Sequence, residues 1–339
     1  MPSPVFIELP NAFHQELAHF NVKRLLPSKP LACWQLDLHA DLTYLVAEGH
    51  YIEDLRLRVK PQLPVAETCA SSTAFVSWFE ALAHKGPGQN HPLFKFLAAD
   101  ASDAQMRWFL TQEAAGEAGF EDLLALTQVK LPIRPKLECA RNFWDEMGHG
   151  KQSAMHGQML STMVEMLDLQ PRVEDTVWES LALSNTMQAL ATTRRYAYQS
   201  IGALGVIELT APQRVRQVGA GMRRLGYAAK VRSYFDLHAA LDVSHSAAWL
   251  REVIAPLVDA DPACAPFIAE GALMRLLCGQ RCFERYHTDF ERRAQDVEQL
   301  KTITGVVARI RPHDLHAGHA HGHNNVHSDA QPHEAEALG

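Results

Sequence analysis

The sequence predicts an all-helical fold, and two observations support that prediction. Long segments place apolar residues at helical spacing, and alternating strand-like runs bounded by Asn-Gly or Asp-Gly turns are missing. In chain order, the predicted helices span residues 11–25, 35–60, 71–84, 103–128, 136–167, 172–203, 205–228, 230–257 and 267–304.

Short clusters of Pro and Gly mark the ends of most of these helices. They lie at residues 27–30, 61–64, 85–92, 131–135, 210–212 and 259–266. None is long or polar enough to resemble a flexible linker, so residues 91–305 are predicted to form one helical domain. Residues 1–90 are predicted to form a helical extension that packs on this core.

The C-terminal segment, residues 306–339, differs from the rest of the chain. Seven of the 18 histidines lie between His313 and His333, and the low apolar content predicts a disordered tail. Closely spaced residues such as His319, His321 and His323 could bind zinc, nickel or copper loosely. The alternative is a solvated tail with incidental metal affinity.

Composition and charge narrow the function. At 339 residues and 47% hydrophobic content, the chain can bury a sizeable core. The net charge of −7 gives no electrostatic reason to expect nucleic acid or an anionic membrane as a partner. No membrane span or signal peptide is predicted, and six cysteines without a CxxC pair fit a reducing compartment. We therefore expect a cytoplasmic protein that acts on a small molecule.

The segment YFDLHAALDVSH, residues 234–245, carries polar residues within an otherwise apolar helix. His238, Asp242 and His245 follow one another at steps of four and three, so they lie along one stripe of the helix. Burying these three side chains is costly unless a partner uses their lone pairs. A metal ion is one such partner, and an internal hydrogen-bond network or partial exposure is the alternative.

Two further helices carry residues of the same types. Glu208 lies in the apolar run SIGALGVIELTAPQ, where the alternative is an exposed glutamate just before a break at Pro212. In the segment DEMGHGKQSAMH, a continuous helix would place four residues on one stripe, at offsets of 0, 3, 7 and 10: Glu146, His149, Ser153 and His156.

The preceding helix offers Glu113, Glu117 and Glu121 at spacings of four. We consider the case in which this helix runs antiparallel to the next one, with the turn between them near residue 132. Residue 113 would then lie opposite residue 151, which is midway between Glu146 and His156. That register favours Glu113, and a shift of one turn would select Glu117 instead.

Glutamate and histidine side chains that point inward from four helices are a recurring way to hold two iron or manganese ions. Carboxylates bridge such a pair and offset its charge. The chain lacks a four-thiolate set for an iron–sulfur cluster, and a haem would leave the carboxylates unexplained.

The spacing from Glu208 to His-x3-Asp-x2-His, together with the upstream NFWDEMGHGKQSAMH, resembles the haem-oxygenase-like di-iron oxidases, also called iron-containing redox enzymes. The resemblance covers roughly residues 90–290. It implies a haem-oxygenase-like helical bundle that binds iron and no haem. The metal ligands that it implies are Glu113, Glu146, His156, Glu208, His238, Asp242 and His245.

Two details of that ligand set depend on the resemblance. Helical spacing alone favours His149 as the partner of Glu146, because His156 would lie about 15 Å farther along an ideal helix. The resemblance favours His156 instead. Some related enzymes carry an additional glutamate where this chain has Ser153, so a subtype that needs this carboxylate is not expected.

The resemblance implies an O2-dependent non-haem di-iron oxidoreductase acting on a small organic substrate, by N-oxygenation, desaturation or oxidative C–C cleavage. Its cofactors would be two iron ions, with a manganese–iron pair as the alternative, and O2 would be the co-substrate. An external electron donor and a homodimeric assembly are compatible with the sequence. The alternatives are a non-enzymatic metal carrier and a cofactorless relative with the same bundle.

Overall fold

The structure, a computed structural model, describes residues 10–27, 29 and 34–309, without the side chains of residues 294 and 296–309. Every regular element in these ranges is a helix, which confirms the all-helical prediction. The chain divides into two compact units, residues 1–290 and 291–339. Most of the predicted tail, residues 310–339, lies outside the described residues.

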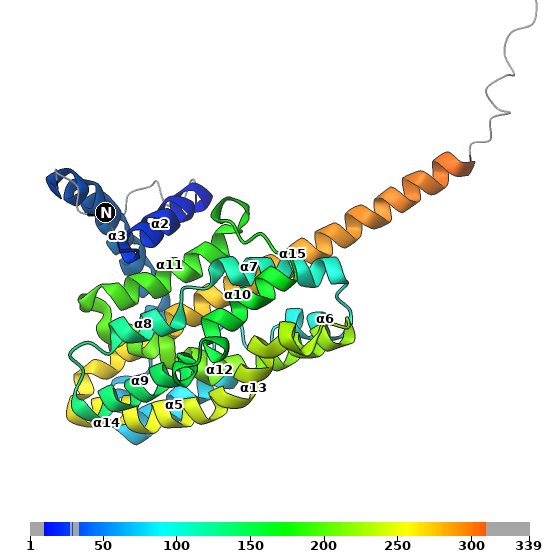
Figure 1. The fold of residues 1–339 in the computed structure, drawn as a ribbon. Coiled ribbons are helices and arrows are strands. Elements are labelled where there is room, and N and C mark those ends of the chain that lie inside the picture. The colour runs from blue at the N-terminus through cyan, green and yellow to red at the C-terminus, as the bar shows by residue number, and fades with distance from the viewer. Residues whose placement is uncertain (1–9, 28, 30–33, 310–339) are drawn as a thin grey trace, which may run out of the picture. The chain divides into compact units, whose positions relative to one another are not determined.

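The helices of the first unit are numbered from the N-terminus (Figure 1). The N-terminal half contains α2 (Pro10–Leu25), α3 (Trp34–Val59), α4 (Ala66–Cys69), α5 (Ser72–Lys85), α6 (Pro92–Ala99), α7 (Asp103–Gly116), α8 (Phe120–Thr127) and α9 (Ile133–Glu146). The remainder contains α10 (His156–Met166), α11 (Trp178–Thr192), α12 (Ala197–Arg224), α13 (Ala229–Ala248), the π-helix η6 (Trp249–Ile254), α14 (Ala255–Ala260) and α15 (Ala265–Arg309), which continues into the second unit.

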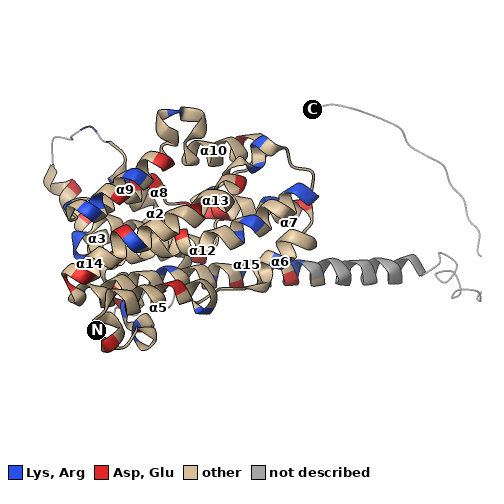
Figure 2. Ribbon diagram, turned by 90° about the horizontal axis from the view of Figure 1, so that it is seen from below, with Lys and Arg blue, Asp and Glu red and all other residues tan. Residues whose placement is uncertain are grey.

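Long-range packing brings α12 and α13 together in the first unit. Helix α12 lies along α13 and α6, α10 packs on α13, and α9 packs on α8 and η6. Helix α11 packs on α2, α7 and α8. Figure 2 shows acidic and basic residues interspersed along these helices. The packing of α9, α10, α12 and α13 places the segments that carry most of the predicted ligands around one region of the interior.

Two glycines allow α12 and the first part of α15 to approach closely. A Cβ atom on Gly202 would lie 1.8 Å from the carbonyl oxygen of Ile268, and one on Gly271 would lie 1.8 Å from that of Gln199. Any side chain here would push the two backbones apart. The contact fixes α12, the helix that carries Glu208, against the core.

Several predicted helix boundaries were wrong, including the one between residues 203 and 205, which lies inside α12. The predicted helix 103–128 is interrupted at residues 117–119, where Gly119 has a φ of 74°, and the predicted helix 136–167 is interrupted at residues 147–155. Pro212 does not end a helix, because α12 continues through it to Arg224. The loss of one backbone N–H at Pro212 is tolerated inside this long, buried helix.

No described helix is both long enough and apolar enough to cross a membrane.

Candidate metal centre

A cavity of about 200 Å³ lies between helices α6 to α13 and the first part of α15. Aromatic and aliphatic side chains form much of its wall, among them Phe94, Phe109, Leu160, Val218 and Phe235. Six of the seven predicted ligands also line it: Glu113, Glu146, His156, Glu208, His238 and Asp242. The seventh, His245, lies beside Glu208, with 3.5 Å between its Nδ1 and Glu208 Oε2. One interior site therefore contains the whole predicted set.

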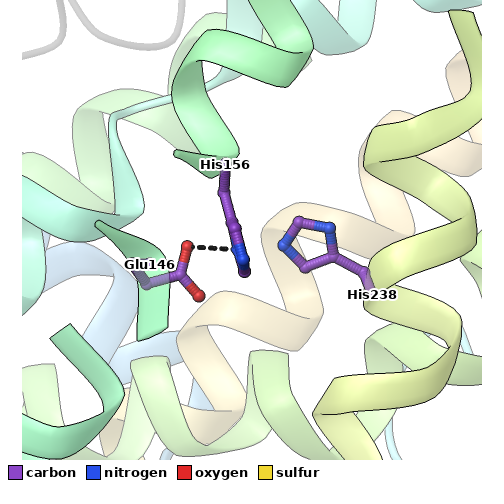
Figure 3. Close-up of side chains that lie close together, drawn as sticks. All are labelled: Glu146, His156 and His238. Carbon is purple, nitrogen blue, oxygen red and sulfur yellow. Dashed lines mark ion pairs between the residues drawn. The ribbon is translucent and has the colours of Figure 1, made fainter. Parts of the chain in front are cut away.

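Glu146, His156 and His238 form one triad of metal-ligand type, with one donor atom from each lying within 4.8 Å of the others (Figure 3). The Nδ1 atom of His156 lies 2.6 Å from Glu146 Oε2, and the His156 and His238 ring centroids are 4.5 Å apart. His238 Nδ1 lies 2.7 Å from the carbonyl oxygen of Tyr234. Because a carbonyl only accepts, this contact assigns the ring proton to Nδ1 and leaves Nε2 as a lone-pair donor.

Glu146 also belongs to a second triad, with Glu208 and His245. Asn142 donates from Nδ2 to Glu208 Oε1 at 2.7 Å, which leaves Oε2 of Glu208 facing His245. On the far side of the His245 ring, Nε2 lies 3.1 Å from Asp145 Oδ2. A carboxylate behind a ligating imidazole is the usual way to hold its ring in place. Glu146 is thus positioned between two adjacent triads.

Two buried nitrogen atoms in these triads lack a hydrogen bond. His156 Nδ1 and His245 Nδ1 are inaccessible to solvent and have no hydrogen-bond partner, although each faces a carboxylate oxygen. Buried polar atoms are rarely left without a partner. Nitrogen and oxygen donors that converge in this way without a hydrogen bond suit a cation, so the residues fit a metal centre.

The pKa shifts of three residues in the cluster also favour a bound cation. Burial, followed by the charge of Glu208, raises the pKa of Glu146 to about 9, and the same two causes raise the pKa of Asp242 to about 9. Burial, followed by the charge of His156, lowers the pKa of His238 to about 4. The carboxylates repel one another, and a bound divalent cation would offset that repulsion.

The break between α9 and α10 brings His156 to Glu146. Helix α9 ends at Glu146, and the next residues include three with positive φ: Gly148 (58°), His149 (54°) and Gly150 (78°). The chain turns back, and α10 begins at His156. The expected single stripe and its separation of about 15 Å were therefore wrong, and this turn removes the conflict that favoured His149.

His149 lies outside both triads. Its side chain is 63% exposed, and its Nε2 lies 2.6 Å from Asp145 Oδ1. Asp145 therefore contacts both His149 and the buried His245.

The structure does not bring Glu113 or Asp242 into either triad. Asp242 is buried on the cavity wall, and its pKa responds to Glu208 and Glu146. Glu113 lies toward two arginines, Arg275 and Arg214, whose charges oppose the rise in its pKa caused by burial. Both remain predicted ligands that line the same cavity.

Three residues near the triads lie outside the predicted ligand set: Asn142, Asp145 and Glu121. Of these, Glu121 was a candidate that the helical register did not favour. Asn142 precedes Glu146 by four residues, so helical spacing could have revealed it. Asp145 could be recognised only once the fold placed His245 beside it. The carboxylate oxygen Oε1 of Glu121 lies 2.7 Å from the place that a Cβ of Gly157 would occupy, next to His156. The helical register that favoured Glu113 fails because α7 ends at Gly116.

Comparison with known protein families gave one match. The sequence model of a family described as iron-containing redox enzymes matches residues 107–280, just over half of the 339-residue chain. The matched segment includes every residue of both triads. A search of curated proteins found no match.

Proposed function

Because the chain belongs to the iron-containing redox enzyme family, we propose that it is an O2-dependent oxidoreductase that holds two iron ions around Glu146. The observation that carries this proposal is the sharing of Glu146 by two triads in which only His238 is not fully buried. A carboxylate has two oxygen atoms and can bridge two cations about 3.5–4 Å apart. Two triads with one shared carboxylate therefore suit two metal ions better than one.

The other ligands divide between the two positions. Next to Glu146, His156 and His238 would hold one ion, and Glu208 and His245 would hold the other. Asp242, buried beside Glu208, would complete the second position. When bound, two ferrous ions would supply electrons for the reduction of dioxygen, and a manganese–iron pair would supply the same chemistry.

The protein's own side chains would bind the substrate and exclude water. The aromatic and aliphatic wall of the cavity lies next to the triads and suits an organic molecule with an apolar part. Asn142 and Asp145 would keep Glu208 and His245 oriented through the hydrogen bonds described above. The reaction would be N-oxygenation, desaturation or oxidative C–C cleavage, with an external donor returning the metals to the ferrous state.

Anaerobic titration with Fe(II) followed by exposure to oxygen tests the proposal. We expect two irons per chain and a transient visible absorption band after oxygen is added. The variant that combines Glu208→Ala with His245→Ala should lose at least one iron, because it removes two members of one triad. His84→Ala, at an exposed position of α5, is the control and should load normally. Unchanged loading of the double variant would contradict the site assignment.

A further inference from the structure

Two arginines line the same cavity without an anionic partner in contact. Arg214 on α12 and Arg275 on α15 both face it. Neither guanidinium forms an ion pair or a hydrogen bond with any described residue, and Arg275 Nε is buried without a partner. The Arg214 guanidinium carbon lies 5.4 Å from the centroid of the Phe283 ring. Its positive charge therefore lies against an aromatic wall of the cavity.

Two other half-buried arginines are paired with carboxylates. Arg24 donates to Glu48 at 2.7 Å, and Arg56 donates to Glu270 at 2.8 Å. Arg214 and Arg275 instead face a cavity. A half-buried charge without a partner is costly, because the protein replaces part of the water that would solvate it. The two guanidiniums therefore offer unused donors to a group that enters the cavity.

Carboxylates lie near the two guanidiniums without forming an ion pair with them. Burial, followed by repulsion from Arg275, lowers the pKa of Arg214 to about 9, while Glu113 and Asp242 act in the opposite direction. Asp242 belongs with the carboxylates of the metal cluster. Glu117, which also senses Arg275, accepts a hydrogen bond from the backbone N–H of Gly119 at 3.1 Å. Glu113 and Glu117, the two carboxylates whose charges interact with Arg275, both have a pKa raised by burial.

Arg214 lies on the same helix as Glu208, a member of one triad. Arg214 follows Glu208 by six residues on α12, which is about 9 Å along the helix axis. Ala211, Val215 and Val218 line the cavity from the same helix. A molecule with its anionic end at Arg214 would extend an apolar part along this wall toward the metal cluster.

We propose that Arg214 and Arg275 bind the carboxylate group of a substrate whose apolar part extends to the metal centre. The planar guanidinium offers paired donors to a carboxylate, and the nearby Glu113 and Asp242 side chains disfavour a dianionic phosphate more than a monoanionic carboxylate. That the bound carboxylate is the substrate rests on the proposed function, whereas the binding site itself does not.

Octanoate is a suitable probe, and octan-1-ol is its neutral counterpart. Binding is measured by calorimetry on the full chain under anaerobic conditions, with and without Fe(II). Native protein should bind octanoate more tightly than octan-1-ol. Arg214→Gln and Arg275→Gln should each weaken octanoate binding by about 10- to 100-fold, the range expected for losing a charged hydrogen bond. Arg214→Lys should recover part of the affinity because it keeps the charge.

Matched controls separate this proposal from the proposed function. Arg216→Gln makes the same charge change at an exposed position on α12 and should bind octanoate as the native chain does. Iron stoichiometry should stay at the native value in all these variants. The proposal is overturned if native protein does not bind octanoate, if octan-1-ol binds equally well, or if Arg214→Gln leaves octanoate affinity unchanged. Octanoate binding that depends on Arg214 in a chain that takes up no iron would refute only the proposed function.

Discussion

Glu146 is the residue on which both triads depend. It is the last residue of α9, so the negative end of the helix dipole adds to the cost of its own charge. Burial and Glu208 already raise its pKa to about 9. Without a cation, this position would hold a proton at neutral pH. A metal ion would displace that proton, and the Glu146 carboxylate could then bind two cations.

A second carboxylate near Glu146 can be identified by substitution. Glu121 lies beside Gly157 at the start of α10, whereas Glu113 lies toward Arg275 and Arg214. We therefore expect Glu121→Gln to weaken iron binding by at least about tenfold and Glu113→Gln to leave it nearly unchanged. Both substitutions remove one negative charge from the same cavity, so each serves as the control for the other. Iron per chain after dialysis is the measurement, and a larger loss in Glu113→Gln would restore the sequence-based choice.

The predicted residues differ in how firmly the sequence could place them. His238, Asp242 and His245 share one continuous helix, α13, and its period alone puts them on one side. The pairing of Glu146 with His156 could not be derived from spacing, because it depends on backbone angles in the nine residues between the helices. The position of Glu121 depends in the same way on the short break at residues 117–119.

At the level of elements, the turn between α9 and α10 decides which histidine meets Glu146. The turn contains a close backbone contact, since a Cβ on Gly148 would lie 2.3 Å from the carbonyl carbon of Ala154. The φ of 58° at Gly148 is itself unfavourable for any residue with a side chain. The path of the turn therefore requires a residue without a side chain at this position.

We expect Gly148→Ala to separate His156 from Glu146. Backbone strain alone should lower the free energy of unfolding by about 1–2 kcal/mol, and the clash with Ala154 should add to this. Urea unfolding measures the stability, and Fe(II) titration should show weaker binding. Gly49→Ala is the control, because a Cβ there meets nothing within 4 Å on helix α3. Unchanged iron affinity in Gly148→Ala would show that the turn does not position His156.

The contact between α2 and α11 contains a titratable group. His14 is buried, lies 3.4 Å from Asn185 through its Nδ1, and stacks on Trp178. Burial, followed by the charge of Arg281, lowers its pKa from 6.5 to about 3. The folded chain therefore keeps His14 neutral at pH values where the unfolded chain protonates it.

Acid should destabilise this contact in a defined range. Above pH 6.5 neither state binds the proton, so His14 has no effect on the pH dependence. Between pH 6.5 and about 3 only the unfolded state binds it, and stability should fall by about 1.4 kcal/mol per pH unit. Urea unfolding at pH 7 and pH 5, with a chelator present, should show a smaller fall in His14→Gln than in the native chain. His39→Gln, at an exposed position, should keep the native pH dependence, and equal falls in all three would contradict the prediction.

At the level of the whole molecule, the sequence could predict the helical class but not every boundary. Helical spacing is a property of each segment, so long helices such as α2 and α3 were predicted nearly to their ends. A break was predicted at Pro212 because a proline usually ends a helix. Packing against α13 and α6 instead holds α12 together through this residue. Long-range packing was the information missing from the local pattern.

Every residue of the two triads lies in the first unit, as does the whole segment that matches the family. Removing residues 311–339 should therefore leave two irons per chain and the native octanoate affinity. The seven histidines of that segment offer imidazoles that favour nickel and zinc, so the truncated chain should bind fewer nickel ions than the full chain.

A full-length variant with serine at positions 313, 316, 319, 321, 323, 327 and 333 separates loss of histidine from loss of length. If truncation removed both irons while the serine variant kept them, residues 311–339 would be required in some other way. If both variants lost iron, the histidines would supply or retain the metal, and a metal carrier would explain the chain better than an oxidase.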